Sequence, residues 1–405
     1  MNQSPHHSPN ASLTSPSKAP TSPGLTPAQP PPPKSEGSDF VKRAGFTLLM
    51  AYSFLGLVAQ GVRCVIPVVM LIKVMMFNEI LRINQKERKD RQMPYFKLLP
   101  WYFLTVTVFA MLAYNLKEVL LNTVPAWAIF YRNVGITTFA LYVVGFVAFV
   151  LSLRKGYYKY QIGQFTWISM TLIFIMVQGS LQITNMLNGM FFFLLPVSCV
   201  VHNDVWAYAC GKLFGRTKLL ALSPKKTLEG FLGAWVMTTI WAVWFAGYMP
   251  RFKRLVCPEL DLLGSVGNAN CEIDAIFLPA HAIAFPSFVA SVTGWSGLTL
   301  TPMQLHAIVF AAFSSLIAPF GGFFASGLKR AFKLKDFGTL IPGHGGMTDR
   351  MDCQIIMGLF TFVYLQTVIF RGEQCPSVDH IVTCLMSLPP AQLQHVLNQV
   401  KGSPP

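Results

Sequence analysis

Charged side chains are scarce in this chain. Only 12% of its 405 residues are Asp, Glu, Lys or Arg, whereas an ordinary soluble domain has about 25%. Hydrophobic residues make up 53%, and apolar runs of about 20 residues, the length that crosses a bilayer, recur along most of the sequence. This composition excludes a soluble globular protein. It predicts an all-α, polytopic transmembrane helical bundle.

Several common catalytic motifs are also missing. The sequence has no GxxxxGK[ST] phosphate-binding loop, no GxGxxG motif and no CxxC pair with the spacing of a zinc site. Eight scattered histidines define no Ser-His-Asp arrangement. Most of the eight cysteines are expected to be buried thiols. Cys257 and Cys271 are the exception, because they flank a polar segment. If this segment faces an oxidising lumen, the two cysteines can form a disulfide, and the pairing is left open.

Nine hydrophobic segments are predicted, with the first two forming a close pair that a re-entrant arrangement would also explain. They are residues 44–62, 64–78, 99–121, 135–153, 165–183, 186–202, 230–249, 305–328 and 353–371. Four amide side chains interrupt the fifth and sixth segments: Gln178, Gln182, Asn185 and Asn188. Polar groups at that depth are expected to face the bundle interior or a wet cavity.

Three regions follow from this pattern. Residues 1–39 form a Pro/Ser-rich tail that cannot bury enough apolar surface to fold, so we expect it to be disordered and cytosolic. Residues 40–372 form the membrane domain, and residues 373–405 form a C-terminal tail. Within the membrane domain, residues 250–304 form a long loop.

Basic residues set the expected orientation. With the N-terminus in the cytosol, the loops at 79–98, 154–162, 203–229 and 329–352 hold 19 Lys and Arg, whereas those at 122–134 and 250–304 hold four. The positive-inside rule therefore places the first set in the cytosol and the 250–304 loop in the lumen. The net charge of +15 is explained by this topology and by contact with anionic lipid headgroups. No nucleic-acid partner is expected.

Acidic residues number only 17, so a local group of them is informative. Asp336, Asp349 and Asp352 share one cytosolic segment, and the last two, at i and i+3, are expected to point the same way. Carboxylates aimed at polyphosphate oxygens are the usual protein ligands of Mg²⁺, and paired metals assist in-line nucleotidyl transfer. The alternative is that these residues only mark a cytosolic loop and cap the following helix.

The same segment carries hydroxyl, basic and glycine residues. Ser326, Lys329 and Arg330 lie at i, i+3 and i+4, so they share one helix face that would meet a lipid phosphate at headgroup depth. Further residues suited to phosphate binding are Lys335, Gly338, Pro342, Gly343, His344, Gly345, Gly346 and Arg350.

A second cytosolic segment has related chemistry. Asp204 ends one apolar run, and Ser223, Lys225, Lys226 and Thr227 precede the next. Paired lysines beside two hydroxyls suit a phosphate-bearing ligand. Read alone, a lysine pair before a helix is more often a topology signal, and Glu229 is also explained as a helix-start carboxylate.

Residues 326–352 match S-x-x-K-R-x4-K-D-x-G-x3-P-x-H-G-G-x2-D-R-x-D at every fixed position. In this run the chain resembles the integral-membrane phosphatidate cytidylyltransferases, or CDP-diacylglycerol synthases. The second segment is similar to that family too, and the resemblance extends over about residues 44–371. The long 250–304 loop and the proline-rich tail look like those of eukaryotic members.

The resemblance implies that CTP and phosphatidic acid react to give CDP-diacylglycerol and pyrophosphate. It implies Mg²⁺, with room for a second cation, bound by Asp204, Asp336, Asp349 and Asp352. Phosphate contacts are assigned to Ser223, Lys225, Lys226, Thr227, Ser326, Lys329, Arg330, Lys335, Gly345, Gly346 and Arg350. His344 is assigned either as a general acid or base or as a donor that fixes the loop.

The eukaryotic character of the sequence suggests the endoplasmic reticulum, with the active site facing the cytosol. A homodimer is left open. The nearest alternative function is a CTP-dependent polyprenol or diacylglycerol kinase, which would release CDP rather than pyrophosphate. Alternatives from other classes are a membrane transporter, which predicts inverted repeats or mid-membrane charges, and a non-catalytic scaffold.

Overall fold

The computed structural model describes residues 45, 49–50, 52–84, 97–117, 128–220, 223–258, 271, 273–284, 297–338, 340, 345–370 and 393. The predicted N-terminal tail, nearly all of the C-terminal segment, His344 and much of the 250–304 loop lie outside these residues. The side chains of Ser223 and Lys225 also lie outside them.

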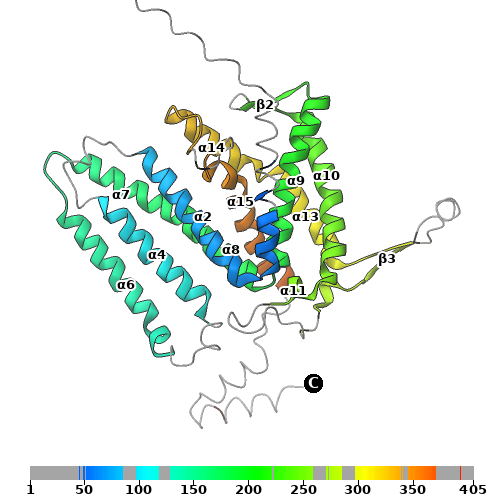
Figure 1. Cartoon of the computed structure of the whole chain (residues 1–405), viewed down its shortest axis with the longest axis horizontal. Helices are drawn as coiled ribbons and strands as arrows, with labels where there is room; N and C mark the ends of the chain where they lie inside the picture. The colour runs from blue at the N-terminus through cyan, green and yellow to red at the C-terminus, as the bar shows by residue number, and fades with distance from the viewer. Residues whose placement is uncertain are drawn as a thin grey trace, which may run out of the picture.

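The fold consists mainly of helices, with two short hairpins (Figure 1). The first part of the chain forms α2 (Val62–Ile83), α4 (Leu99–Asn115), α6 (Ala128–Leu151) and α7 (Tyr158–Leu172). Helix α7 continues through a π-helical turn, η3 (Ile173–Val177), into α8 (Gln178–Leu187). The rest forms α9 (Phe191–Phe214), α10 (Leu228–Tyr248), α13 (Pro302–Leu316), α14 (Pro319–Ala331), α15 (Thr348–Tyr364) and a last π-helical turn, η6 (Leu365–Ile369).

Seven helical stretches among the described residues are long and apolar enough to cross a membrane. The predicted all-α membrane architecture is therefore confirmed. Of the other two predicted segments, one is helix α4, which has 17 residues, and the other, residues 44–62, is only partly described. The predicted boundaries shift most at α9, which continues to Phe214, so that Asp204 lies within a helix and not in the loop after it.

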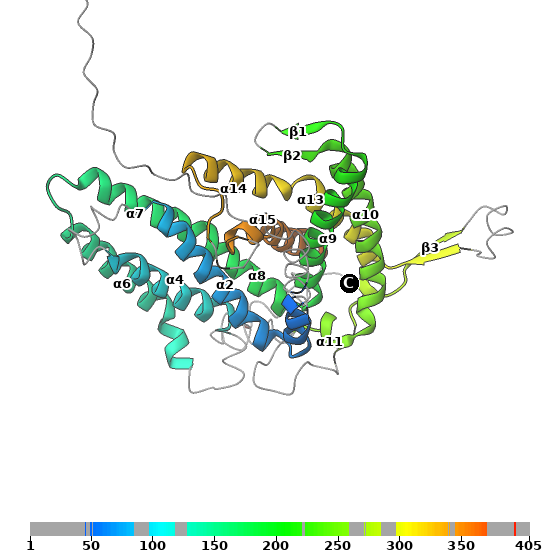
Figure 2. The ribbon, with the colours of Figure 1, turned by 45° about the horizontal axis from the view of Figure 1, so that its top comes forward.

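The helices form two groups with α15 between them (Figures 1 and 2). One hydrophobic cluster joins α9, α10 and α13, and Cys353 and Met357 of α15 belong to it. A second joins α2, α4, α6 and α7, and Ile355 of α15 belongs to that one. Helix α15 thus packs on both groups through residues that lie two positions apart.

The predicted segment 305–328 folds as two helices. Helix α13 begins with a capping box in which Thr301 and Gln304 satisfy each other's backbone N–H groups, and it ends at Leu316. Pro319 starts α14, because a proline lacks the N–H needed to continue a helix but fits the first helical turn. Figures 1 and 2 show α14 running in a different direction from α13.

The predicted interior position of the amides in α8 is confirmed for three of them. Gln178, Gln182 and Asn185 are buried. Lys73 of α2, which is also buried, donates a hydrogen bond to the Gln178 side-chain oxygen. This contact ties α2 to α8 within the bundle, where a polar group needs a partner.

Two short hairpins lie at opposite ends of α10. Strands β1 (Lys218–Leu220) and β2 (Ser223–Thr227) precede its first turn. After its last turn come η4 (Met249–Arg251), α11 (Lys253–Val256) and η5 (Ala275–Phe277), and then β3 (His281–Ala284) and β4 (Gly297–Leu300), which extend away from the helices (Figures 1 and 2). Cys257 and Cys271 form a disulfide in this second region, so the pairing left open from the sequence is confirmed.

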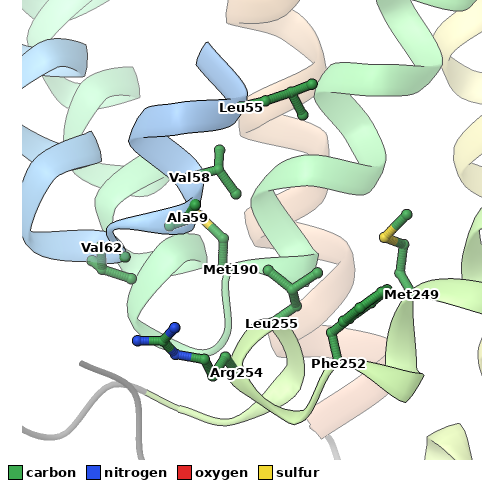
Figure 3. A pocket seen from close by; sticks show the side chains of 10 residues that line it. Leu55, Val58, Ala59, Val62, Met190, Met249, Phe252, Arg254 and Leu255 are labelled. Carbon is green, nitrogen blue, oxygen red and sulfur yellow. The ribbon is translucent and has the colours of Figure 1, made fainter. Parts of the chain in front are cut away.

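A cavity of about 320 Å³ lies at the α11 end of the molecule (Figure 3). Its walls are mostly apolar and include Leu55, Met190, Met249 and Phe252, with Arg254 at one edge. None of the signature residues lines it.

Candidate active site

Two carboxylates and one lysine from distant parts of the chain come together beside β2. Asp204 lies on α9, Lys226 near the end of β2 and Asp352 on α15. Lys226 interacts electrostatically with both carboxylates, and the two carboxylates interact with each other. Figures 1 and 2 show β2 next to the place where α9, α14 and α15 approach one another. Asp204 is exposed and Asp352 is half-buried, so the group opens to the outside of the bundle.

Helix α14 supplies the floor of this group. The Lys226 ammonium lies 4.8 Å from the centre of the Phe323 ring, a cation–π contact that fixes the lysine over α14. A Cβ at Gly321 would lie 2.5 Å from the backbone oxygen of Asp352, and one at Gly322 would lie 3.3 Å from its Oδ2. The two glycines therefore allow α14 to approach α15 closely enough to put Lys226 and Asp352 side by side.

An ion pair one helical turn away connects α14 and α15 a second time. Lys329 Nζ donates to Asp349 Oδ1 at 2.6 Å, and both side chains are largely buried. Asp349 Oδ2 accepts from the backbone N–H groups of Phe337 and Gly346, at 2.9 and 3.0 Å. Asp349 thus contacts α14 once and the signature loop twice. Asp352 Oδ1 accepts from the Cys353 N–H at 2.7 Å, and its carboxylate interacts electrostatically with Asp204.

The rest of the signature surrounds this pair. Gly345 has φ of +85°, a conformation that favours glycine, and a Cβ there would lie 3.3 Å from Asp349 Oδ2 and 3.5 Å from the Asp336 side chain. Ser326 is half-buried on α14, one turn before Lys329. Four charged residues are exposed around the rim: Arg330, Lys335, Asp336 and Arg350.

The second predicted segment builds the start of α10. Thr227 caps this helix by accepting a hydrogen bond from the Gly230 N–H at 3.2 Å. Glu229 is more than a helix-start carboxylate: it accepts from the backbone N–H groups of Arg216 and Thr217 and from the Thr217 hydroxyl. A Cβ at Gly230 would lie 2.7 Å from the backbone oxygen of Ala207, so this glycine lets α10 pack directly on α9. These contacts hold Lys226 next to Asp204.

Among the described residues no group of three or more His, Cys, Asp or Glu side chains is arranged to hold a metal ion. Asp204 and Asp352 form a pair of carboxylates that interact electrostatically. Two carboxylates fit Mg²⁺, which commonly takes one or two protein carboxylates and completes its octahedral shell with water and substrate phosphates.

The sequence analysis did not single out one residue that contacts the signature segment. Glu79, in the last turn of α2, accepts hydrogen bonds from the backbone N–H groups of Met347 and Thr348, both at 2.8 Å. In the sequence Glu79 is the first residue of the predicted basic loop 79–98, and no pattern there points to a role for it. Phe323, Gly321 and Gly322 were also missed, because nothing in an apolar helix shows which residue faces a lysine 97 positions earlier.

Comparison with known proteins gives consistent matches. A family model described as "Cytidylyltransferase family" matches residues 41–368. Phosphatidate cytidylyltransferase 1 of Arabidopsis thaliana is 42% identical over 361 residues, covering 87% of this chain and 85% of its own. Phosphatidate cytidylyltransferase of Saccharomyces cerevisiae is 39% identical, covering 90% and 80%, and phosphatidate cytidylyltransferase 2 of Homo sapiens is 37% identical, covering 89% and 81%.

Proposed function

Because this chain belongs to the cytidylyltransferase family, we propose that it transfers the cytidylyl group of CTP to phosphatidic acid. Membership confirms the resemblance and the enzyme class predicted from the sequence, and it sets aside the transporter and scaffold alternatives. In the reaction, a phosphate oxygen of phosphatidic acid forms a bond to the α-phosphorus of CTP. The bond from that phosphorus to the bridging oxygen breaks, and pyrophosphate leaves with the electron pair. The lipid product is CDP-diacylglycerol.

The observation that carries this proposal is the meeting of Asp204, Lys226 and Asp352 at the outer end of the helices. The nucleophile is a phosphate that is already anionic at neutral pH, so the site needs no strong base. It needs to bring two anions together and to stabilise the charge of the departing pyrophosphate. A lysine fixed beside two carboxylates, with further basic residues on the rim, can meet both requirements.

Asp204 and Asp352 are the residues that would hold Mg²⁺. When bound there, the ion would neutralise charge on the phosphate oxygens of the nucleotide. The protein's own part is to keep the two carboxylates near each other on α9 and α15. Asp349 differs, because both of its oxygens already accept hydrogen bonds from Lys329, Phe337 and Gly346. We assign Asp349 to holding the loop. A second cation and a homodimer stay predictions.

The phosphates of the two substrates would bind the cations around the carboxylates. Lys226 lies at the centre of the group, and Arg350 interacts electrostatically with Asp204. Arg330 and Lys335 are exposed on the rim and suit the headgroup of phosphatidic acid. Ser326, one turn from Lys329, suits the same phosphate. The site thus has an inner position for the nucleotide and an outer one for the lipid.

The chain is an integral membrane protein, and we propose that its active site faces the cytosol from the endoplasmic reticulum. The Cys257–Cys271 disulfide lies at the α11 end of α10, and disulfides form in oxidising compartments such as the lumen of that organelle. The signature residues lie at the opposite end of α10. The same end carries most of the basic residues, as the positive-inside rule requires of a cytosolic face.

The test is to purify the protein in detergent and follow CTP labelled at the α-phosphate in the presence of phosphatidic acid and Mg²⁺. We expect label in a lipid product and release of unlabelled pyrophosphate. Asp352→Asn should lower both strongly at the Mg²⁺ concentration that saturates the wild-type protein. Asp274→Asn, which removes a carboxylate near the disulfide, should leave them unchanged. Label that stays in soluble CDP while a lipid acceptor gains phosphate would make the protein a kinase and overturn the proposal.

A further inference from the structure

The helix that carries two signature carboxylates begins without a cap of its own. The first N–H groups of any α-helix have no partner within the helix, and a Ser, Thr, Asp or Asn usually supplies one from the preceding residue. The residue before α15 is Met347, which has helical dihedral angles and no capping side chain. The residues before it in the structure are Gly345 and Gly346, which cannot cap either.

Glu79 of α2 fills this role from 268 residues away. Its Oε1 accepts from the Met347 N–H and its Oε2 from the Thr348 N–H, both at 2.8 Å. The side chain is buried, with 9% of the residue's surface exposed. A buried carboxylate is costly unless hydrogen bonds compensate it, and here each oxygen has its own donor at the positive end of a helix dipole.

Two glycines of the signature close around the same carboxylate. A Cβ at Gly338 would lie 2.7 Å from Glu79 Oε1, and one at Gly346 would lie 2.8 Å from Oε2. Real Cβ atoms do not come that close, so the loop can wrap the carboxylate only because both positions lack a side chain. The contacts with Glu79 therefore account for glycine at both positions, without any contact to a substrate.

Two carboxylates therefore share the backbone N–H donors at the start of α15. The Gly346 N–H donates to Asp349, and the next two N–H groups donate to Glu79. A phosphate group bound at this helix start would have to compete with Glu79 for the same two donors. Glu79 thus occupies the anion position of this helix and leaves the substrate phosphates to the lysines and arginines.

We propose that Glu79 is a positioning residue of the transfer reaction: it fixes where α15 begins and thereby sets the places of Asp349 and Asp352. Asp349 is the second residue of α15 and Asp352 lies less than one turn further. A shift of the first turn would move both relative to Lys329 on α14 and Asp204 on α9. A displacement of about 1 Å at a reacting group is enough to cost about 10²-fold in rate.

The inference rests on the activity proposed above, so its test includes one measurement that needs no activity. Glu79→Gln keeps the size of the side chain but replaces one acceptor oxygen with an NH₂ group that would face an N–H. We expect kcat for CDP-diacylglycerol formation to fall about 10²-fold, with the KM for phosphatidic acid within about twofold of wild type. The Mg²⁺ concentration for half-maximal rate should rise. Glu79→Asp, which keeps the charge, should recover part of the loss.

Hydrogen exchange supplies the independent measurement. In Glu79→Gln the peptide covering residues 345–352 should exchange faster than in wild type, while peptides from α10 and α13 stay unchanged. Asp274→Asn serves as the matched control and should change neither exchange nor kinetics. Wild-type exchange at 345–352, or activity lost only in proportion to the loss of folded protein, would overturn the positioning role. A wild-type protein that makes no CDP-diacylglycerol would refute the proposed function, and the exchange result would still decide for or against Glu79.

A double substitution distinguishes the loss of the Glu79 cap from a general loss of structure. The three atoms nearest to a Cβ at Gly338 all belong to Glu79, so Gly338→Ala should lower activity because the new methyl displaces this side chain. In a Glu79→Ala background that clash no longer exists. We expect the second substitution to add little further loss. Losses that multiply would show that Gly338 and Glu79 act separately, and the proposal would fail.

Discussion

Lys329 and Asp349 join α14 to α15 through an ion pair of 2.6 Å that is largely closed to solvent. The pair connects the helix that carries the basic half of the signature with the helix that carries the acidic half. Removing one partner of such a pair leaves the other charge buried and uncompensated.

Lys329→Met should therefore lower the free energy of unfolding by about 3 kcal/mol, because Asp349 loses its counter-ion while its carboxylate stays enclosed. Thermal unfolding in detergent measures this. Arg330→Met changes the exposed neighbour on the same helix and should shift the midpoint little. Equal shifts for the two variants would show that the ion pair contributes nothing specific.

Lys226→Met should reduce the rate of CDP-diacylglycerol formation by about 10²- to 10³-fold, because the transition state loses a fixed cation next to the phosphates. Lys226→Arg keeps the charge and should lose less. The Mg²⁺ requirement should not rise, since removing a cation beside Asp204 and Asp352 does not weaken their attraction for the ion. Lys218→Met, at an exposed position of β1, is the control.

Asp204→Asn and Asp352→Asn should each raise the Mg²⁺ concentration needed for half-maximal rate, because each removes one carboxylate from the proposed site. A chelator should abolish wild-type activity, and added Mg²⁺ should restore it. The double variant should be little worse than either single one, since residues that act as a unit are not additive. Strictly multiplicative losses would separate the two carboxylates into different functions.

Removal of the disulfide should affect stability and leave catalysis nearly intact. Cys257 and Cys271 close a loop with a sequence separation of 14, and a loop of about 15 residues corresponds to about 3 kcal/mol. Cys257→Ser with Cys271→Ser should therefore unfold at a lower temperature but retain its kcat before unfolding. A large loss of kcat below that temperature would contradict the separation of the disulfide from the active site.

Gly230→Ala should impair folding, because the added methyl meets the backbone of Ala207 and Gly211 on α9. Neither backbone can move without separating α9 from α10. Gly163→Ala in α7 is the matched substitution, since nothing lies within 4 Å of the added methyl, and it should be neutral or stabilise by up to about 1 kcal/mol. The yield of monodisperse protein and the unfolding temperature compare the two.

The helical architecture and the acidic signature could be predicted from the sequence. The lengths of the apolar runs indicate the helices, and the scarcity of Asp and Glu makes the acidic group stand out. Spacing predicted that Ser326, Lys329 and Arg330 share one helix face and that Asp349 and Asp352 point the same way, but it did not predict the ion pair between Lys329 and Asp349. The division of labour between the two carboxylates does not follow from spacing. Asp349 and Asp352 lie three residues apart, yet one binds the loop and the other interacts electrostatically with Asp204 and Lys226.

The features that the sequence analysis missed depend on which helices become neighbours. Glu79 and Met347 are separated by most of the chain, and no local pattern connects them. Asp204 was placed after its helix because the apolar run ends near residue 202, whereas the helix continues to Phe214 against α10. Pro319 marks in the sequence the place where the segment 305–328 divides into two helices. The direction of α14 could not be predicted from this proline, because it depends on packing against α15.

The position of α15 between two hydrophobic clusters limits how this enzyme can be divided into fragments. Asp204 and Lys226 come from one group of helices, Glu79 comes from the other, and α15 lies against both. The proposed catalytic centre thus lies at the boundary between the two groups of helices and belongs to no separate domain. A fragment that keeps either group alone retains part of the centre and has no means to complete it, so activity returns only when both groups share one bilayer and enclose α15 again.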